Sequence, residues 1–488
     1  MEPLEPLHSD VTVVGAGGAG LYAALCAARD GAQVTLVSAT PLAESASYWA
    51  QGGLAAALAE DDAPERHLRD TVIAGRGAVR ESAARVLCNE APGIVHDLAD
   101  LGVRFDADRH GRLALGLEGG HSARRVVHAG GSATGRRVTR QLSALVAEHP
   151  SIDVLEGRRA VGVIVIDGRC RGVFLAGGDR VASAAVVLAT GGAAALWART
   201  TNPAGATGGG LLLAHAAGAA LADLELVQFH PTAIAAPNGG DGFLITEAIR
   251  GEGALLLDAS GERFVDELAP RDEVARAIQN LMTDTGASSV ALDMREVDPR
   301  LFPNVIDALR KAGIDPERQL VPVSPAAHYM MGGIATDLDG RSTVPGLYAV
   351  GECACTGLHG ANRLASNSLS ECFVFGARAA RAALAEPSGP APPEAIRAAE
   401  PPPRPPALTA ASRQALWERA GIERDRDGLW SLREDPHPLV RLIADAALAR
   451  TESRGAHQRR DFPNLDPAFE GLHVMMEPSG RPAFDRWV

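Results

Sequence analysis

Two glycine-rich segments, far apart in the chain, contain the residue types that bind anions. The later segment starts with Gly351 and Glu352 and continues over residues 358–369, LHGANRLASNSL. Cationic, amide and hydroxyl donors stand there beside glycines, just after the apolar run 346–350. Such a composition is suited to holding an anion against the backbone rather than to filling a core. The earlier segment, GAGGAG at 15–20, also follows a short apolar run.

The earlier segment matches the glycine fingerprint of dinucleotide-binding turns. We predict a strand over 11–14, a helix over 21–29 and a second strand over 34–37, which is the βαβ context that the fingerprint needs. Glycines let the backbone approach a pyrophosphate, which binds at the N-terminus of the helix. The second strand ends in Ser38 rather than in an acidic residue. Ser38 can hydrogen-bond a ribose, but this departure counts against NAD as the ligand.

Two later strand-to-glycine turns are expected at 186–192 and 348–352. Together with the early fingerprint, they are typical of flavoproteins in which interleaved segments build one cofactor site. We therefore expect a single flavin site with an anionic substrate beside it.

Four further clusters place histidine, arginine, threonine and glutamate among apolar residues, at 228–232, 244–254, 269–276 and 326–333. With the glycine-rich segment they offer two histidines and three arginines near the expected flavin: His230, His328, Arg250, Arg271 and Arg363. A dicarboxylate needs a cation or donor for each carboxylate, and arginine forks and imidazoles provide them. Each residue alone has an ordinary structural explanation, but their joint occurrence favours an active site.

The composition argues against several other classes of protein. The chain has 488 residues, a net charge of -13 and an aromatic content of 4%. Negative charge and few aromatic rings argue against binding to nucleic acid or to an anionic membrane. The N-terminal ten residues lack the basic and apolar regions of a signal peptide, and no apolar run reaches membrane length, so a cytoplasmic protein is expected.

Cysteines and the remaining histidines are expected to have no special role. The 6 cysteines lack the spacing of a zinc or iron–sulfur site, so we expect reduced thiols and no metal. Six histidines that lack such neighbours are expected to be solvated: His8, His67, His96, His110, His149 and His437.

The length predicts more than one domain. We expect an α/β fold made of a Rossmann-like FAD-binding domain (1–225 and 334–385), an inserted α+β capping domain (226–333), a Pro-rich linker (386–407) and a small helical C-terminal domain with its tail (408–488). Helical periodicity at 412–420 and 437–450 supports the C-terminal domain.

At these residues the chain resembles the family of succinate dehydrogenase and fumarate reductase flavoprotein subunits. The resemblance extends over about residues 10–378 and resumes at 452–457. Its motifs are long and specific: 50–53, 202–203, 228–232, 246–253, 270–272, 328–329 and 357–371. It implies an FAD-binding fold with a dicarboxylate site.

Within that family the chain is most similar to the L-aspartate oxidases. Succinate dehydrogenases attach FAD covalently through a histidine five residues before the glutamine of their AQGG motif, where this chain has Ala46. The resemblance therefore implies noncovalent FAD. Glu118, in the sequence EGGHS, matches the aspartate-oxidase pattern and is implied to face the substrate ammonium. A carboxylate there distinguishes aspartate from succinate, because it pairs with the first and repels the second.

The resemblance also implies roles for individual residues. His230, Thr246, His328 and Arg363 would hold the two carboxylates, with Arg250 helping to orient them, and Arg271 would be a proton shuttle, relayed through Glu247 and Arg250. The implied FAD contacts are Gly15, Ala16, Gly17, Gly18, Ala19, Gly20, Ser38, Ala46, Ser47, Tyr48, Trp49, Ala50, Gln51, Gly52, Gly53, Glu352, Ser368 and Leu369. Ala39 and Gly209 depart from the family pattern and predict weaker FAD binding.

The function implied by the resemblance is oxidation of L-aspartate to iminoaspartate, with oxygen or fumarate reoxidising FAD. This reaction is the first step toward quinolinate and NAD, and a functional link to quinolinate synthase is expected. The nearest alternative is a soluble fumarate reductase or succinate dehydrogenase-type flavoprotein. Another alternative is a noncatalytic subunit that docks on an iron–sulfur partner. An FAD-dependent ketosteroid dehydrogenase lacks support, because the expected pocket is cationic rather than apolar.

Overall fold

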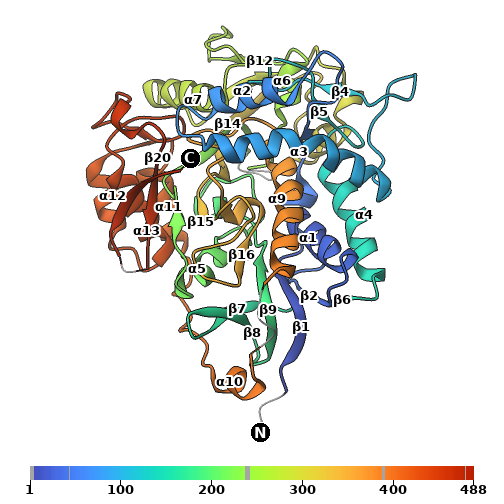
Figure 1. The fold of residues 1–488 in the computed structure, drawn as a ribbon. Helices are drawn as coiled ribbons and strands as arrows, with labels where there is room; N and C mark the ends of the chain where they lie inside the picture. The colour runs from blue at the N-terminus through green and yellow to red at the C-terminus, as the bar shows by residue number, and fades with distance from the viewer. Residues whose placement is uncertain (1–4, 43, 237–241, 387–390, 479, 488) are drawn as a thin grey trace.

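The structure is a computed structural model that describes residues 5–42, 44–236, 242–386, 391–478 and 480–487. Its centre is a seven-stranded sheet with the order β6, β2, β1, β9, β8, β7, and β16 also pairs with β9 (Figure 1). The strands are β1 Leu7–Val14, β2 Val34–Val37, β6 Ile152–Leu155, β7 Ala160–Ile166, β8 Arg169–Leu175, β9 Arg180–Leu188 and β16 Leu347–Ala349. β6, β2, β1, β9 and β16 are parallel, so helices must cross over between them.

The predicted dinucleotide-binding turn is present between β1 and helix α1 (Gly18–Arg29). Gly15 has a φ of 112°, and a Cβ there would lie 2.2 Å from the carbonyl oxygen of Ala189. A Cβ at Gly20 would lie 1.9 Å from the carbonyl oxygen of Gly15. Both positions therefore require glycine. The helix begins three residues before the predicted start, so the glycine turn is tighter than the pattern indicated.

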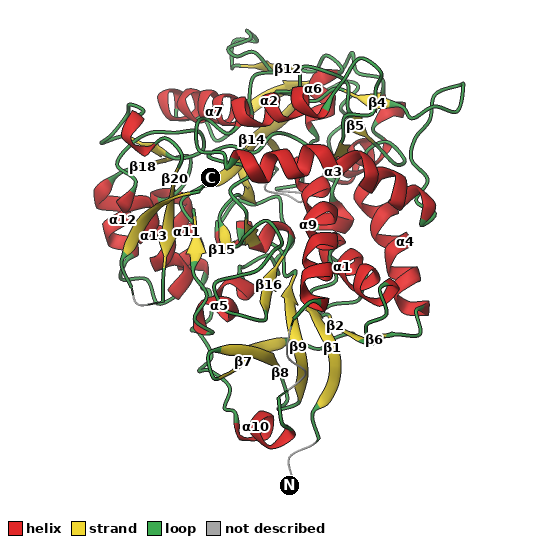
Figure 2. Cartoon of the chain, viewed as in Figure 1, coloured by secondary structure: helices red, strands yellow, loops and turns green. Residues whose placement is uncertain are grey.

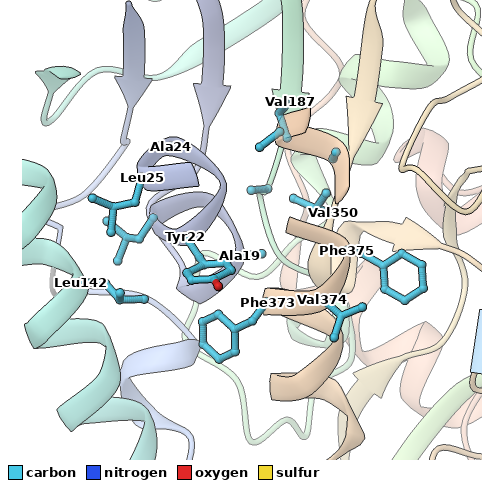
Figure 3. Close-up of a cluster of buried hydrophobic side chains, with 14 of the residues drawn as sticks. Ala19, Tyr22, Ala24, Leu25, Leu142, Val187, Val350, Phe373, Val374 and Phe375 are labelled. Carbon is cyan, nitrogen blue, oxygen red and sulfur yellow. The ribbon is translucent and has the colours of Figure 1, made fainter. Parts of the chain in front are cut away.

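Helix α9 (Asn367–Leu384) packs against α1 and holds the late glycine-rich segment beside the early one. Figure 3 shows the contact, with Tyr22 of α1 facing Phe373 of α9. Their ring centroids are 5.3 Å apart in an edge-to-face arrangement. Val187 of β9 and Val350 belong to the same apolar cluster, beside the two helices. Burial of these rings fixes the two segments relative to each other although about 350 residues separate them in sequence.

The inserted unit is built on an antiparallel sheet with the order β11, β14, β13, β12 (Figure 2). Its strands are β11 Val227–Ile234, β12 Leu255–Leu257, β13 Val290–Asp293 and β14 Val321–Met330, and its helices are α6 Glu247–Gly251, α7 Arg271–Thr285 and α8 Pro303–Lys311. A separate apolar cluster that includes Val274, Ile278 and Val305 forms its core. The unit has its own core and lies above the central sheet in Figure 1.

The C-terminal region contains helices α11 Ala410–Arg419, α12 Arg426–Leu432 and α13 Pro438–Ala449. Its end returns to the body of the protein, because β20 Leu472–Met476 pairs with β10 Leu221–Ala222 and β21 Pro482–Arg486. These strands belong to a five-stranded sheet completed by β15 Gly333–Ala335 and β17 Ala354–Cys355. The tail therefore adds strands that the helical expectation did not include.

Part of the predicted Pro-rich linker, residues 387–390, lies outside the described residues. The remainder contains helix α10 (Pro393–Ala398), whose Ile396 is fully buried against Ile164 and Phe174. This segment consequently packs on the strands β7 and β8.

The remaining elements connect these units. They are α2 Pro64–Ala74, α3 Glu81–Asp100, α4 Thr134–Glu148, α5 Gly209–Ala216, the strands β3 Leu54–Ala55, β4 Leu115–Gly116, β5 Val126–Val127, β18 Glu423–Arg424 and β19 Gln458–Arg459, and the 3-10 turns η1 Ser47–Trp49, η2 Ala194–Leu196, η3 Pro299–Leu301, η4 Gly351–Cys353 and η5 Pro467–Phe469. Over the described part of the chain, none of these helices is long and apolar enough to span a membrane.

Candidate active site

A cavity of about 480 Å³ joins the glycine turn, the segment 46–53 and the late glycine-rich segment to the inserted unit. It is lined by most of the predicted FAD contacts: Gly17, Gly18, Ala19, Ala46, Ser47, Trp49, Ala50, Gln51, Gly52, Gly53, Glu352, Ser368 and Leu369. It is also lined by seven of the eight predicted substrate residues: Glu118, His230, Thr246, Glu247, Arg271, His328 and Arg363. The two groups, dispersed over the sequence, therefore face one space.

Six predicted residues lie outside the lining: Gly15, Ala16, Gly20, Ser38, Tyr48 and Arg250. Gly15 and Gly20 lie inside the turn, packed so closely against neighbouring carbonyl oxygens that no side chain fits. The Ser38 hydroxyl donates a hydrogen bond of 2.5 Å to the carbonyl of Thr40. Arg250 is fully buried behind Glu247, with 3.7 Å between Arg250 Nη2 and Glu247 Oε2. Arg250 therefore acts on the cavity through its charge and through Glu247, without lining the cavity itself.

The residues present fit a flavin dinucleotide. Helix α1 points its N-terminus at the cavity, where Gly17 and Gly18 provide a backbone without side chains. Gln51 also lines the cavity, and its buried Oε1 has no hydrogen-bond partner in the described structure, so it is an acceptor left for a ligand. Burial raises the pKa of the Glu352 carboxyl to about 7, which favours the neutral form that can donate a hydrogen bond.

Two arginines that line the cavity, Arg271 and Arg363, are held by one glutamine. Gln228 Oε1 accepts hydrogen bonds from Arg271 Nη1 at 3.1 Å and from Arg363 Nη2 at 3.2 Å. Arg363 also donates to Ser368 Oγ at 2.6 Å and stacks on Tyr329, with 4.4 Å between its Cζ and the ring centroid. Burial and the nearby Arg271 lower the pKa of Arg363 to about 10, so it stays a cation at neutral pH. Two positive charges therefore lie close together, and an anionic ligand bound beside them would stabilise both.

Glu247 balances part of this charge. Its Oε2 accepts a hydrogen bond of 2.6 Å from Arg271 Nε, and its Oε1 accepts one of 3.0 Å from the backbone N–H of Gly119. Burial alone would raise the pKa of Glu247, but Arg271 and Arg250 outweigh burial and lower it to about 2. Glu247 is therefore an ionised partner that fixes the orientation of Arg271.

His230 and His328 form a pair on neighbouring strands, with ring centroids 5.1 Å apart. Nδ1 of His328 lies 2.8 Å from Oγ1 of Thr201, and Nδ1 of His230 accepts from the backbone N–H of Thr232 at 3.2 Å. Burial, together with the surrounding arginines, holds the pKa of both imidazoles well below the usual range. Both rings are neutral at pH 7 in the free protein, so His230 keeps its proton on Nε2 and can donate it in a hydrogen bond.

Glu118 lies in the same cavity with 5% of its surface exposed. Its Oε2 accepts a hydrogen bond of 2.7 Å from the hydroxyl of Ser366. A carboxylate and a group of cations thus share one enclosed space, which is suited to a ligand with both negative and positive groups.

Sequence reasoning missed several residues of the site. Gln228, Tyr329 and Ser366 lie within the predicted motifs, but they are uncharged, and the presence of charge or imidazole singles out only their neighbours. The expectation that His67 and His437 are solvated was wrong, since both are buried. Nε2 of His67 lies 2.8 Å from Oδ1 of Asn367 at the start of α9, a partner that is distant in sequence.

Comparison with known proteins agrees with this geometry. A family model described as FAD binding domain matches residues 10–369, and one described as fumarate reductase flavoprotein C-term matches 437–479. E. coli quinol fumarate reductase has a chain of similar structure, with a TM-score of 0.89 and 27% identity over 99% of this chain and 98% of that one. Mycobacterium smegmatis Sdh1 gives a TM-score of 0.82 and 30% identity over 99% of this chain and 94% of that one. These matches confirm the predicted fold class and FAD as the cofactor.

The fold and site define an FAD-dependent flavoprotein of the succinate dehydrogenase and fumarate reductase type. L-aspartate oxidase of Caulobacter vibrioides is 47% identical over 96% of each chain, and that of Streptomyces coelicolor is 41% identical over 96% of this chain and 91% of its own. The chain belongs to the L-aspartate oxidase family.

Proposed function

We propose that the protein oxidises L-aspartate to iminoaspartate with bound FAD, as the first step of NAD biosynthesis through quinolinate. Oxygen or fumarate then accepts the electrons. The observation that supports this most strongly is the carboxylate of Glu118 in the same cavity as Arg271 and Arg363. An α-amino dicarboxylic acid presents two negative groups and one positive group, so it complements both kinds of side chain.

The carboxylates of aspartate are proposed to bind to the arginine and to the hydrogen-bond donors of the cavity wall. Arg363 and the neutral imidazoles of His230 and His328 donate hydrogen bonds, and Thr246 adds a hydroxyl. Arg250, which does not line the cavity, acts through Glu247 and helps orient these groups only indirectly. Arg363 and Arg271 keep their orientation because Gln228 accepts from both.

The reaction removes two electrons and two hydrogens from the amino acid, with one hydrogen coming from Cα and one from the nitrogen. Cα loses hydrogen with its electron pair and nitrogen loses a proton, so a C=N bond forms. Bound FAD supplies the acceptor for the electron pair. When fumarate is reduced instead, one carbon takes the electron pair with hydrogen and the other takes a proton, which Arg271 is proposed to deliver from its ion pair with Glu247.

FAD is proposed to bind without a covalent bond. Ala46 lines the cavity at the position where a succinate dehydrogenase has its histidine, and its methyl group has no nucleophile. The same residue, with Glu118, makes a soluble fumarate reductase or succinate dehydrogenase the less favoured function.

Iminoaspartate hydrolyses in water to oxaloacetate and ammonia. We therefore propose a functional link to quinolinate synthase, which would use the product before it hydrolyses. No nucleic-acid or membrane partner is proposed.

The test is product formation by the purified, FAD-loaded protein in air. With L-aspartate it should produce equal amounts of hydrogen peroxide, ammonia and oxaloacetate. The Glu118→Gln variant should lose most of this activity, by about 10- to 100-fold in kcat/KM, because the ammonium loses its ionic partner. Wild-type protein that releases no ammonia from aspartate but oxidises succinate would contradict the proposal.

A further inference from the structure

Ser366 occupies the N-cap position of α9 without capping the helix. A serine at this position normally has extended backbone angles and accepts a hydrogen bond from the helix N-terminus. Here it has a φ of 60° and makes no side-chain capping bond. A left-handed serine is strained, and a hydroxyl diverted from its usual local partner indicates a use elsewhere.

The hydroxyl of Ser366 joins two parts of the cavity wall. It donates to Glu118 Oε2 at 2.7 Å and accepts from the backbone N–H of Gly53 at 3.1 Å. Gly52 lies so close that a Cβ there would be 3.2 Å from Ser366 Oγ and 3.8 Å from Glu118 Oε1. The carboxylate of Glu118 is thus fixed against the segment expected to touch the flavin.

A second contact holds the same two loops together. Nε2 of His121 lies 2.9 Å from the carbonyl oxygen of Ala365, the residue before Ser366. The turn at Ser366 is also held by helix α2, because Asn367 contacts both His67 and Thr71. Ser366 is 5% exposed, so water does not compete freely for its hydrogen bonds.

We propose that Ser366 is the positioning residue for amine recognition, which deepens the proposed function and rests on it. By donating to one oxygen of Glu118, it fixes the carboxylate where the substrate ammonium binds. A dicarboxylate without an amine makes no use of this arrangement. Loss of the hydroxyl should therefore weaken aspartate binding and leave fumarate binding nearly unchanged.

The test compares two reactions of the same FAD-loaded enzyme: aspartate oxidation, and reduction of fumarate by a reduced viologen dye. Ser366→Gly removes the hydroxyl and tolerates the left-handed backbone, and Ser366→Ala removes the hydroxyl alone. We expect the KM for aspartate to rise roughly 10-fold in both, as for loss of a hydrogen bond to a charged group, with the KM for fumarate within about 2-fold of wild type.

The matched control is Ser370→Ala. Ser370 is a buried serine of the same helix that donates to the carbonyl of Ala55 at 2.8 Å. It has no contact with Glu118, so both KM values should stay within about 2-fold of wild type. The Glu118→Gln background provides the second control, because Ser366→Gly should add no further loss there.

Equal losses with aspartate and fumarate, or a full additional loss in the Glu118→Gln background, would show that Ser366 only supports the flavin segment, and either would overturn the inference. An unchanged KM for aspartate in both Ser366 variants would also overturn it, while wild-type turnover of aspartate would leave the proposed function intact. Wild-type protein that does not oxidise aspartate would refute both.

Discussion

Glu247 and Arg271 form a buried ion pair in the cavity wall, with 2.6 Å between Glu247 Oε2 and Arg271 Nε. The second oxygen of Glu247 accepts from the backbone of Gly119, the residue after Glu118. One carboxylate therefore orients the proposed proton-delivering arginine and also holds the loop that presents the proposed ammonium ligand. The cationic and anionic sides of the site are linked through a single side chain.

Replacing Glu247 with Gln should disturb both the orientation of Arg271 and the loop that presents Glu118. The variant removes the charge that balances Arg271 and Arg250, and loss of one member of a buried pair leaves the other unbalanced. We expect kcat/KM to fall about 100-fold or more for aspartate and for fumarate, with a lower melting temperature. Steady-state kinetics and thermal unfolding measure this.

The matched control for that change is Glu273→Gln. Glu273 pairs with Arg76 at the surface, where ion pairs contribute little, so kcat/KM should not change. If Glu247→Gln behaved like this control with both substrates, the ion pair would have no role in the reaction.

The Arg363→Lys variant keeps the positive charge but loses the planar guanidinium group. Arginine reaches Ser368 and Gln228 with two different nitrogens, which a lysine ammonium cannot reproduce. The KM for aspartate and the inhibition constant for succinate should both rise by about 10- to 100-fold, because the carboxylate is common to both ligands. A change confined to aspartate would instead assign Arg363 to amine recognition.

Arg378→Lys is the control for Arg363. Arg378 pairs with Glu90 and Asp339 and does not line the cavity, so both constants should match those of wild type.

Noncovalent FAD should be released by acid. Ala46 offers no atom for a covalent link, so precipitation with trichloroacetic acid should leave the flavin in the supernatant with the absorbance of free FAD. Flavin that stays with the washed pellet would contradict the proposed binding mode.

Stability should fall as the pH drops below about 6.5, and His67 should account for part of the loss. Burial and the adjacent His121 lower the pKa of His67 to about 3, whereas an unfolded histidine titrates near 6.5. Between these values the unfolded chain binds a proton that the folded chain does not, so the free energy of unfolding decreases by about 1.4 kcal/mol per pH unit for this group.

The His67→Gln variant removes this titration and keeps a side chain able to contact Asn367. Its melting temperature should depend less steeply on pH than that of wild type between pH 7 and 5, with both proteins saturated with FAD. Parallel curves would show that His67 is protonated equally in the folded and unfolded chains.

The sequence predicted the parts of the site that depend on residue type. Gly15 and Gly20 were recognisable because only glycine fits a turn so close to neighbouring carbonyls. Arg363 and His230 were recognisable because ionisable side chains are uncommon among apolar residues without a ligand or partner. The position of Arg250 was not predictable, since its place behind Glu247 depends on the packing of α6.

Individual contacts between distant segments could not be predicted from the sequence. Ser366 and Glu118 are 248 residues apart, and His67 and Asn367 are 300 apart. Neither pair has a local pattern, because the contacts exist only after α9 packs on α1 and the inserted unit closes the cavity. The strand β20 was missed for the same reason, because its partner β10 is far away in sequence, with Leu221 paired to Met476.

The most direct test of the proposed function is the visible spectrum of the FAD-loaded protein under anaerobic conditions, with L-aspartate in one cuvette and succinate in another. We expect aspartate to bleach the flavin absorbance and succinate to leave it unchanged, because only aspartate has an amine for Glu118. Bleaching by succinate alone would refute L-aspartate oxidation as the function and make Glu118 an ordinary acid of the cavity wall.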